Sequence, residues 1–269
     1  MLAVPVPELR AFASLDPADE LSVRAGDPDL ERLLQATASG FLAAVGPVEQ
    51  GVLSATTTIP RSVGLAGSSA LIIAALRALA AAAGHRFEPV DLAELALSIE
   101  RDRMGVEAGL QDRLVQALAE PVAMEFEPVS YRSVQPPDDL PLFVAWSEAA
   151  SETSDTVHRS LRRRFDAGDQ HVITSMAGLA EQARRAAQAV ERADLPRLAA
   201  AINRTFEIRA LMVDIDPTTL RLAEIGRRAG AAMNTAGSGG SVVGLAPSAA
   251  HVEQAIEAFE DAGHRALAL

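Results

Sequence analysis

The chain has 269 residues, 49% of them hydrophobic, which is enough for one or two domains with a buried core. The formal net charge is −12, so a nucleic-acid partner is not expected. The sequence contains arginines but no lysine, so the lysine of a P-loop is absent. There is no cysteine, which excludes disulfides, thiolate metal sites and a cysteine nucleophile. Arg77 interrupts the longest apolar run, and the N-terminal residues do not show the pattern of a signal peptide. We therefore expect a cytoplasmic protein without a membrane partner.

Strands and helices are predicted from alternation, β-branched content and helical spacing. Pro5 and Pro7 confine the first strand to a sheet edge or a bulge. Asp91 is expected to cap the helix that follows it. In the first half of the chain, strands are predicted at 2–6, 10–15, 52–59 and 121–128, and helices at 30–45, 68–84, 90–104 and 111–119.

The second half of the chain opens on a Pro- and Asp-rich stretch, SVQPPDDLP, which indicates a boundary between two domains at 1–135 and 136–269. Strands are predicted at 140–146, 242–246 and 265–269, long helices over 154–230, and one more helix at 249–262. Strands and helices mix without strict βαβ alternation, so an α+β fold is favoured over a doubly wound sheet.

A turn of small residues stands at the start of the most apolar helix. Gly64 and Gly67 precede Ser68 and Ser69, and the helix then runs to Gly84. One interpretation is structural: a serine caps the helix and the glycines form the turn. The other is that phosphates lie on the free amides of the first helical turn, with a serine hydroxyl available to Mg²⁺. Spacing alone leaves both open.

A second glycine turn, Gly237–Gly240 within AGSGGS, lies late in the chain. It is either a tight connection between elements or a concavity of backbone amides that binds an anion. The dinucleotide pattern G-x-G-x-x-G fails here, because Val242 stands where the third glycine belongs.

Residues 60–70, PRSVGLAGSSA, resemble the second signature of the GHMP kinases, P-x-x-x-G-L-x-x-S-S-A. Residues 235–243, TAGSGGSVV, resemble the third signature of the same family. GHMP kinases phosphorylate galactose, homoserine, mevalonate and related alcohols. The segments AGLQDRLVQ and HRSLRRRFDAGD resemble in particular the glucuronokinase branch. The resemblance implies two lobes, an N-terminal one like domain 2 of ribosomal protein S5 and a ferredoxin-like C-terminal one.

The resemblance also implies roles for individual residues. Asp112 matches the catalytic aspartate that accepts or orients the proton of the substrate hydroxyl, although a first-turn aspartate is common for structural reasons. Ser69 and Glu100 match the Mg²⁺ ligands. Substrate contacts are assigned to Ser154, Thr156 and Arg162, for which the alternative is a solvated helix face. The nucleotide site comprises Gly64, Leu65, Ala66, Gly67, Ser68, Ser69, Ala70, Gly237, Ser238, Gly239 and Gly240.

The function implied is an ATP- and Mg²⁺-dependent kinase of a sugar or sugar acid, phosphorylating the anomeric hydroxyl and acting as a monomer or homodimer. The alternative is a non-catalytic nucleotide- or metabolite-binding relative. We find no match to the first GHMP signature, and MLAVPVPELRAFASL resembles the strand that follows it. From this we expect weak Mg·ATP binding and slow turnover by these 269 residues, and a strand and glycine turn encoded upstream.

Overall fold

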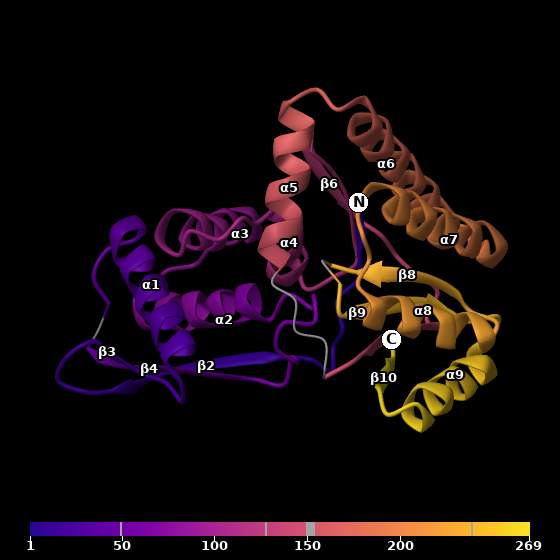
Figure 1. The fold of residues 1–269 in the computed structure, drawn as a ribbon. Helices are drawn as coiled ribbons and strands as arrows, with labels where there is room; N and C mark the ends of the chain where they lie inside the picture. The colour runs from indigo at the N-terminus through magenta and orange to yellow at the C-terminus, as the bar shows by residue number, and fades with distance from the viewer. Residues whose placement is uncertain (49, 127, 149–153, 238) are drawn as a thin grey trace. The chain divides into compact units, whose positions relative to one another are not determined.

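The chain folds into two compact units. The computed structural model describes residues 1–269 except 49, 127, 149–153 and 238, and the side chains of 154–159 also lie outside the described part (Figure 1). One unit, here the N-terminal unit, comprises Pro5–Ile59 and Ala66–Glu120. The other, the C-terminal unit, comprises Met1–Val4, Pro60–Leu65 and Pro121–Leu269. The division by packing falls after residue 120, and the domain boundary at 135 stays a prediction.

The N-terminal unit is built on a three-stranded sheet of order β2-β4-β3. Strands β2 (Ala11–Pro17) and β4 (Gly51–Thr57) pair antiparallel along their whole length, and β3 (Ser22–Arg24) runs parallel to β4. Buried and more exposed residues alternate along the first five positions of β4, so one face of this sheet carries Ala55 and the completely buried Leu53.

The helices described in the N-terminal unit are α1 (Pro28–Ala44), α2 (Gly67–Ala82), α3 (Pro89–Ser98) and α4 (Leu110–Leu118). A single π-helical turn, η1 (Ile99–Arg103), continues α3. Asp27 caps α1 by accepting hydrogen bonds from the amides of Asp29 and Leu30. The side chains of α2 and its neighbours form the core, in which Leu34, Phe41, Leu53, Ile72, Leu76 and Leu79 are fully buried.

Arg77 explains how one cation fits into the apolar helix α2. Its Nη2 donates to the carbonyl oxygen of Ala117 at 2.9 Å and to that of Gln116 at 3.4 Å, both near the C-terminal end of α4. A guanidinium there satisfies carbonyls that have no intrahelical partner and complements the helix dipole. Burial lowers the pKa of Arg77. The residue that breaks the apolar run therefore fixes α2 against α4.

The C-terminal unit contains two sheets. A four-stranded antiparallel sheet has the order β10-β7-β9-β8, from β7 (Leu142–Trp146), β8 (Ala232–Ala236), β9 (Ser241–Leu245) and β10 (Arg265–Ala268). A smaller sheet pairs β1 (Leu2–Ala3), β5 (Val122–Phe126) and β6 (Val129–Ser133). As expected from Pro5, β1 is short and lies at an edge.

The described part of the C-terminal unit also contains the helices α5 (Ser154–Asp166), α6 (Gln170–Glu191), α7 (Leu195–Met212), α8 (Pro217–Arg228) and α9 (Ala249–Asp261). Helices α6 and α7 form an antiparallel hairpin (Figure 1). Phe143, Leu222, Met233 and Phe259 are fully buried in the main core of the unit. Helices lie between β7 and β8 and between β9 and β10, which is the β-α-β-β-α-β order of ferredoxin-like folds.

The α+β class and the two-lobed architecture are confirmed. The sequence missed β3, β6 and β8, because each is short and lacks a clear alternation. The prediction that Asp91 caps α3 is wrong. Pro89 begins the helix, so the N-cap is Glu88 and Asp91 lies in the first turn. Within the described ranges, no helix combines the length and the apolar character needed to cross a bilayer.

Candidate active site

Among the residues that the structure describes, none caps the N-terminus of α2 with its side chain. The helix begins at Gly67, and its N-cap is Ala66, which adopts a left-handed conformation with φ 56° and ψ 38°. Alanine has no polar side-chain atom, so Ala66 cannot accept a hydrogen bond from the first turn. The interpretation in which Ser68 or Ser69 caps the helix is therefore wrong, since both serines lie inside the first turn. The amides of that turn carry the positive end of the helix dipole.

Gly67 is not required by the packing of the protein. A Cβ atom built on it would lie 3.4 Å from Cγ2 of Ile59, which is an ordinary contact, and its φ is not in the left-handed range. The backbone at the start of α2 is therefore bare at a position where the fold would accept a side chain. Close approach of a ligand is the usual use of such a glycine.

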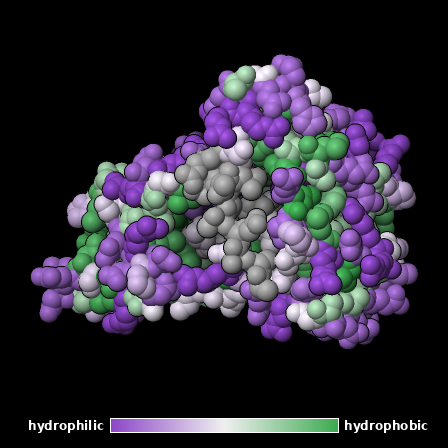
Figure 2. Space-filling model, in the orientation of Figure 1, coloured by the Kyte–Doolittle hydropathy of each residue, from purple (hydrophilic) through white to green (hydrophobic). Residues whose placement is uncertain are grey.

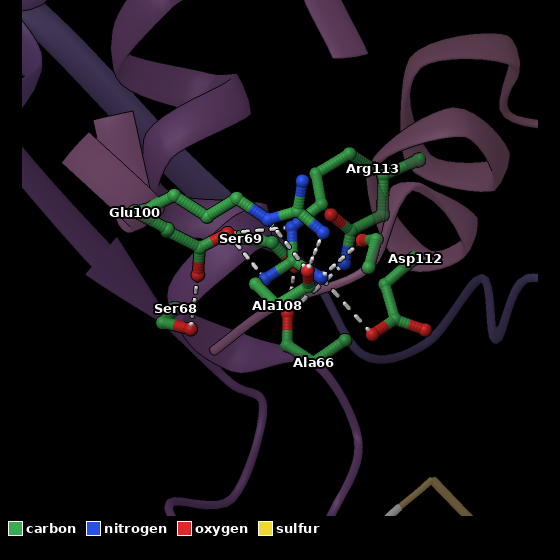
Figure 3. Close-up of polar contacts among 10 residues, drawn as sticks. Ala66, Ser68, Ser69, Glu100, Ala108, Asp112 and Arg113 are labelled. Carbon is green, nitrogen blue, oxygen red and sulfur yellow. Dashed lines mark hydrogen bonds and ion pairs between the residues drawn. The ribbon is translucent and has the colours of Figure 1, made fainter. Parts of the chain in front are cut away.

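The two serines of the first turn have different partners. Ser68 Oγ donates to Oε1 of Glu100 at 3.0 Å (Figure 3). Ser69 is fully buried, and its Oγ donates to the carbonyl oxygen of Ala66 at 3.0 Å. Nε2 of Gln116 donates to the same carbonyl at 3.0 Å. Ser69 and Gln116 therefore hold the turn before α2, while Ser68 faces the carboxylate.

Glu100 is a buried carboxylate, 1% exposed, on the π-helical turn η1. Arg113 of α4, 6% exposed, donates from Nε to Oε2 of Glu100 at 2.5 Å and also contacts Oε2 through Nη2. The extra residue of a π turn redirects the side chains that follow it, and such turns are frequent at functional sites. The interpretation of Glu100 as a solvated charge is therefore excluded.

Asp112 lies in the first turn of α4, with a side chain 41% exposed. Its Oδ2 is 3.3 Å from Nη1 of Arg113, and the same Nη1 donates to the carbonyl oxygen of Gly109 at 2.9 Å. Figure 3 shows Arg113 between the two carboxylates, with Asp112 pointing away from Glu100. One guanidinium thus links the predicted metal ligand to the predicted catalytic aspartate.

Gly64 contacts the second glycine turn within the C-terminal unit. A Cβ atom at Gly64 would lie 2.6 Å from the carbonyl oxygen of Gly239 and 2.9 Å from that of Ala236. A Cβ atom at Gly237 would overlap the carbonyl oxygen of Gly64. Gly64 and Gly237 have φ of 76° and 52°. Both conformation and close approach therefore require glycine at these positions.

Two further side chains hold the Gly237–Gly240 turn. Thr219 Oγ1 accepts from the amide of Gly240 at 2.8 Å. Arg209 of α7 donates from Nη2 to the carbonyl oxygen of Gly237 at 2.7 Å, while its buried Nε has no partner among the described residues. Desolvation lowers the pKa of Arg209. No sequence pattern singles out Arg209, because it is one of many arginines on the helices of this unit.

The predicted substrate residues remain untested. The side chains of Ser154 and Thr156, and all of Ser238, lie outside the described residues. Arg162 of α5 is 73% exposed and pairs with Asp166 one turn later at 3.0 Å. Figure 2 shows a largely hydrophilic surface over this C-terminal part of α5. The pairing fits a solvated helix face and leaves the substrate role of Arg162 a prediction.

The donor atoms of the N-terminal unit fit Mg²⁺. This ion prefers hard oxygen ligands and is usually held by one or two carboxylates together with substrate phosphates and water. Oε1 of Glu100 and Oγ of Ser68 are two oxygen atoms of this kind, and they lie 3.0 Å apart. No group of three or more His, Cys, Asp or Glu side chains suited to a metal occurs among the described residues, so an all-protein metal cage is not seen there.

The model of the GHMP kinases N terminal domain matches residues 32–120, the stretch that contains α2, Glu100 and Asp112. Glucuronokinase 1 of Arabidopsis thaliana is 33% identical over 208 residues, covering 72% of this chain and 57% of the relative. Probable glucuronokinase 2 of the same plant is 34% identical over 211 residues with the same coverages. The chain belongs to the GHMP kinase family.

This GHMP chain spans 57% of the length of the two plant relatives. Among solved structures, phosphomevalonate kinase of Streptococcus pneumoniae in complex with phosphomevalonate and AMPPNP aligns with a TM-score of 0.75 at 17% identity. That alignment covers 97% of this chain and 90% of the other. At that identity the likeness establishes the fold.

Proposed function

We propose that this chain is an ATP-dependent kinase that transfers the γ-phosphoryl group to a hydroxyl of a sugar or sugar acid. The observation that carries the proposal is Glu100, a buried carboxylate against the Ser68 hydroxyl in the first turn of an uncapped helix. Arg113 already pairs with Glu100, but the Ser68 hydroxyl and the backbone amides of the first helical turn beside this carboxylate suit a phosphate with its cation. The glucuronokinase relatives support a sugar acid as acceptor.

The residues divide the chemistry among them. The amides of the first turn of α2 bind phosphate oxygens, because Gly67 leaves the backbone open there. Glu100 and the hydroxyl of Ser68 hold the cation. The assignment of Ser69 as a metal ligand stays a prediction, and Ser68 and Ser69 are the two candidates for the hydroxyl ligand. Bound Mg²⁺ supplies positive charge that stabilises the charge on the transferring phosphoryl group.

Asp112 is proposed to orient the acceptor hydroxyl and to take its proton. Its side chain is 41% exposed and reaches solvent from the start of a helix, where a carboxylate is stabilised in its charged form. Arg113 holds one of its oxygens at 3.3 Å, which limits the directions in which the carboxylate can face. The anomeric hydroxyl is the proposed acceptor position, by similarity to the glucuronokinases.

The test is a panel of acceptors with ATP and Mg²⁺: glucuronate, galacturonate, neutral hexoses, a heptose phosphate and homoserine. Phosphorus NMR of the product identifies the phosphorylated hydroxyl. We expect turnover with a uronic acid and an anomeric phosphate as product. Binding of AMPPNP without turnover on any acceptor would favour the alternative, a non-catalytic relative that keeps the nucleotide site.

A further inference from the structure

Both oxygens of Glu100 are engaged within the protein. Oε1 accepts from Ser68 Oγ at 3.0 Å, and Oε2 is held by Nε and Nη2 of Arg113 (Figure 3). The two side chains of the ion pair are 1% and 7% exposed, so water does not screen their attraction. A cation that binds Glu100 therefore meets a carboxylate that is already neutralised.

Arg113 is anchored at the other side of its guanidinium. Nη1 donates to the carbonyl oxygen of Gly109 at 2.9 Å and lies 3.3 Å from Oδ2 of Asp112. The guanidinium has five donors in a fixed plane, so it can hold these partners and Glu100 together. It also keeps two partners when Glu100 is taken by another cation, which makes an exchange at Glu100 possible without burying an unpaired arginine.

A lone divalent cation gains little at this site. Mg²⁺ holds its water shell firmly, and one carboxylate plus one hydroxyl are too few ligands to replace it. The positive charge of Arg113 repels a second cation at Glu100. Phosphate oxygens change this balance, because they bring further ligands and negative charge to the cation.

We propose that Arg113 is the resident counter-ion of Glu100, and that it restricts the Glu100–Ser68 pair to divalent cations that arrive with nucleotide phosphates. This inference rests on the proposed function, since it assigns the site to a nucleotide–cation complex. Arg113 acts here through Glu100 and is a positioning residue. Its consequence is an ordered site: the cation has low affinity alone and high affinity in company with the nucleotide.

Titration with Mn²⁺, followed by the loss of its free electron paramagnetic resonance signal, tests the inference in the wild-type protein. We expect no saturation by Mn²⁺ alone, and binding to the protein at least about tenfold tighter once AMPPNP is present, counted beyond the signal that AMPPNP removes without protein. Saturable Mn²⁺ binding without nucleotide that disappears in Glu100→Gln would overturn the inference. Failure of AMPPNP to bind even at saturating Mg²⁺, measured by calorimetry, would instead count against the proposed function.

Two substitutions of Arg113 separate charge from shape. Arg113→Met removes the counter-ion, and we expect nucleotide-free Mn²⁺ affinity to rise about tenfold or more, with a melting temperature that now increases with Mn²⁺. Arg113→Lys keeps a positive charge and should bind Mn²⁺ alone as weakly as the wild type. Arg103→Met is the matched control, because Arg103 lies on the same π turn as Glu100 but donates to Ser39 Oγ at 2.9 Å.

The outcomes are distinct. Unchanged Mn²⁺ affinity in a folded Arg113→Met variant would overturn the proposal, as would an equal gain in Arg113→Lys or Arg103→Met. If Arg113→Met folds only when Mn²⁺ is added, the proposal is supported, because the cation then replaces the missing guanidinium. If it does not fold in either condition, the wild-type titration and Arg113→Lys decide the question.

Discussion

Gly64 and Gly237 touch through their backbones, although 173 positions separate them in the chain (237 − 64). Neither residue has room for a Cβ atom, and both have positive φ. The first glycine of one signature and the Gly237 turn of the other are thus in contact within the C-terminal unit, and each limits the conformation of the other.

Substitution of Gly237 by alanine should destabilise the C-terminal unit. We expect a loss of more than the roughly 1–2 kcal/mol that a left-handed conformation alone costs an L-residue, because the new methyl group overlaps the Gly64 carbonyl. Gly230→Ala is the control: Gly230 has φ 83°, but its nearest neighbour, Cγ of Pro247, would be 3.9 Å away. Equal losses in urea unfolding of the two variants would show that the contact with Gly64 is unimportant.

The two serines at the start of α2 should respond differently to alanine. Ser68→Ala removes the hydroxyl that faces Glu100, so Mg·nucleotide affinity should fall about tenfold and recover partly at high Mg²⁺. Ser69→Ala removes a buried hydrogen bond to Ala66 and should lower unfolding free energy by about 1 kcal/mol. Nucleotide titrations at several Mg²⁺ concentrations, with thermal unfolding, measure both. The reverse pattern would identify Ser69 as the ligand.

Asp112→Asn should reduce turnover by about 10²-fold or more and leave nucleotide affinity and folding close to wild type. The reason is that the amide keeps the shape of the side chain but cannot take a proton from the acceptor. Asp102→Asn is a suitable control, since Asp102 is an exposed acid on η1. Wild-type turnover in Asp112→Asn would remove this residue from the mechanism.

His264 should make the C-terminal unit sensitive to acid. Burial lowers the pKa of His264, and the nearby positive charge of Arg221 adds to the effect. A histidine with a lowered folded-state pKa contributes stability above its unfolded pKa of about 6.5 and loses it as pH falls through the folded value. The buried Nδ1 has no partner among the described residues, which disfavours protonation further.

The measurement is the melting temperature between about pH 7 and pH 5, across the unfolded histidine pKa. His264→Gln should lose less stability over this range than the wild type, and Arg221→Gln should lie between the two. A wild-type curve parallel to that of His264→Gln would show that His264 does not titrate on unfolding.

The sequence by itself determined the class of fold and the location of the candidate nucleotide segments. Apolar periodicity located α2 and its preceding turn, because a helix that must be buried shows its pattern locally. The residues PRSVGLAGSSA and TAGSGGSVV were recognisable for a related reason. Their glycines permit backbone conformations, and a close approach of other atoms to the backbone, that few other residues allow.

Only the tertiary structure decided which side chains meet. Three interactions join residues from different elements. Glu100 pairs with Arg113, Ser68 rather than Ser69 donates to Glu100, and Arg209 donates to the carbonyl oxygen of Gly237. Sequence patterns carry the local period of a helix or strand, but a charged residue looks the same whether it is solvated or buried against a partner. Burial and distance depend on how distant segments pack, and that information appears only in the folded chain.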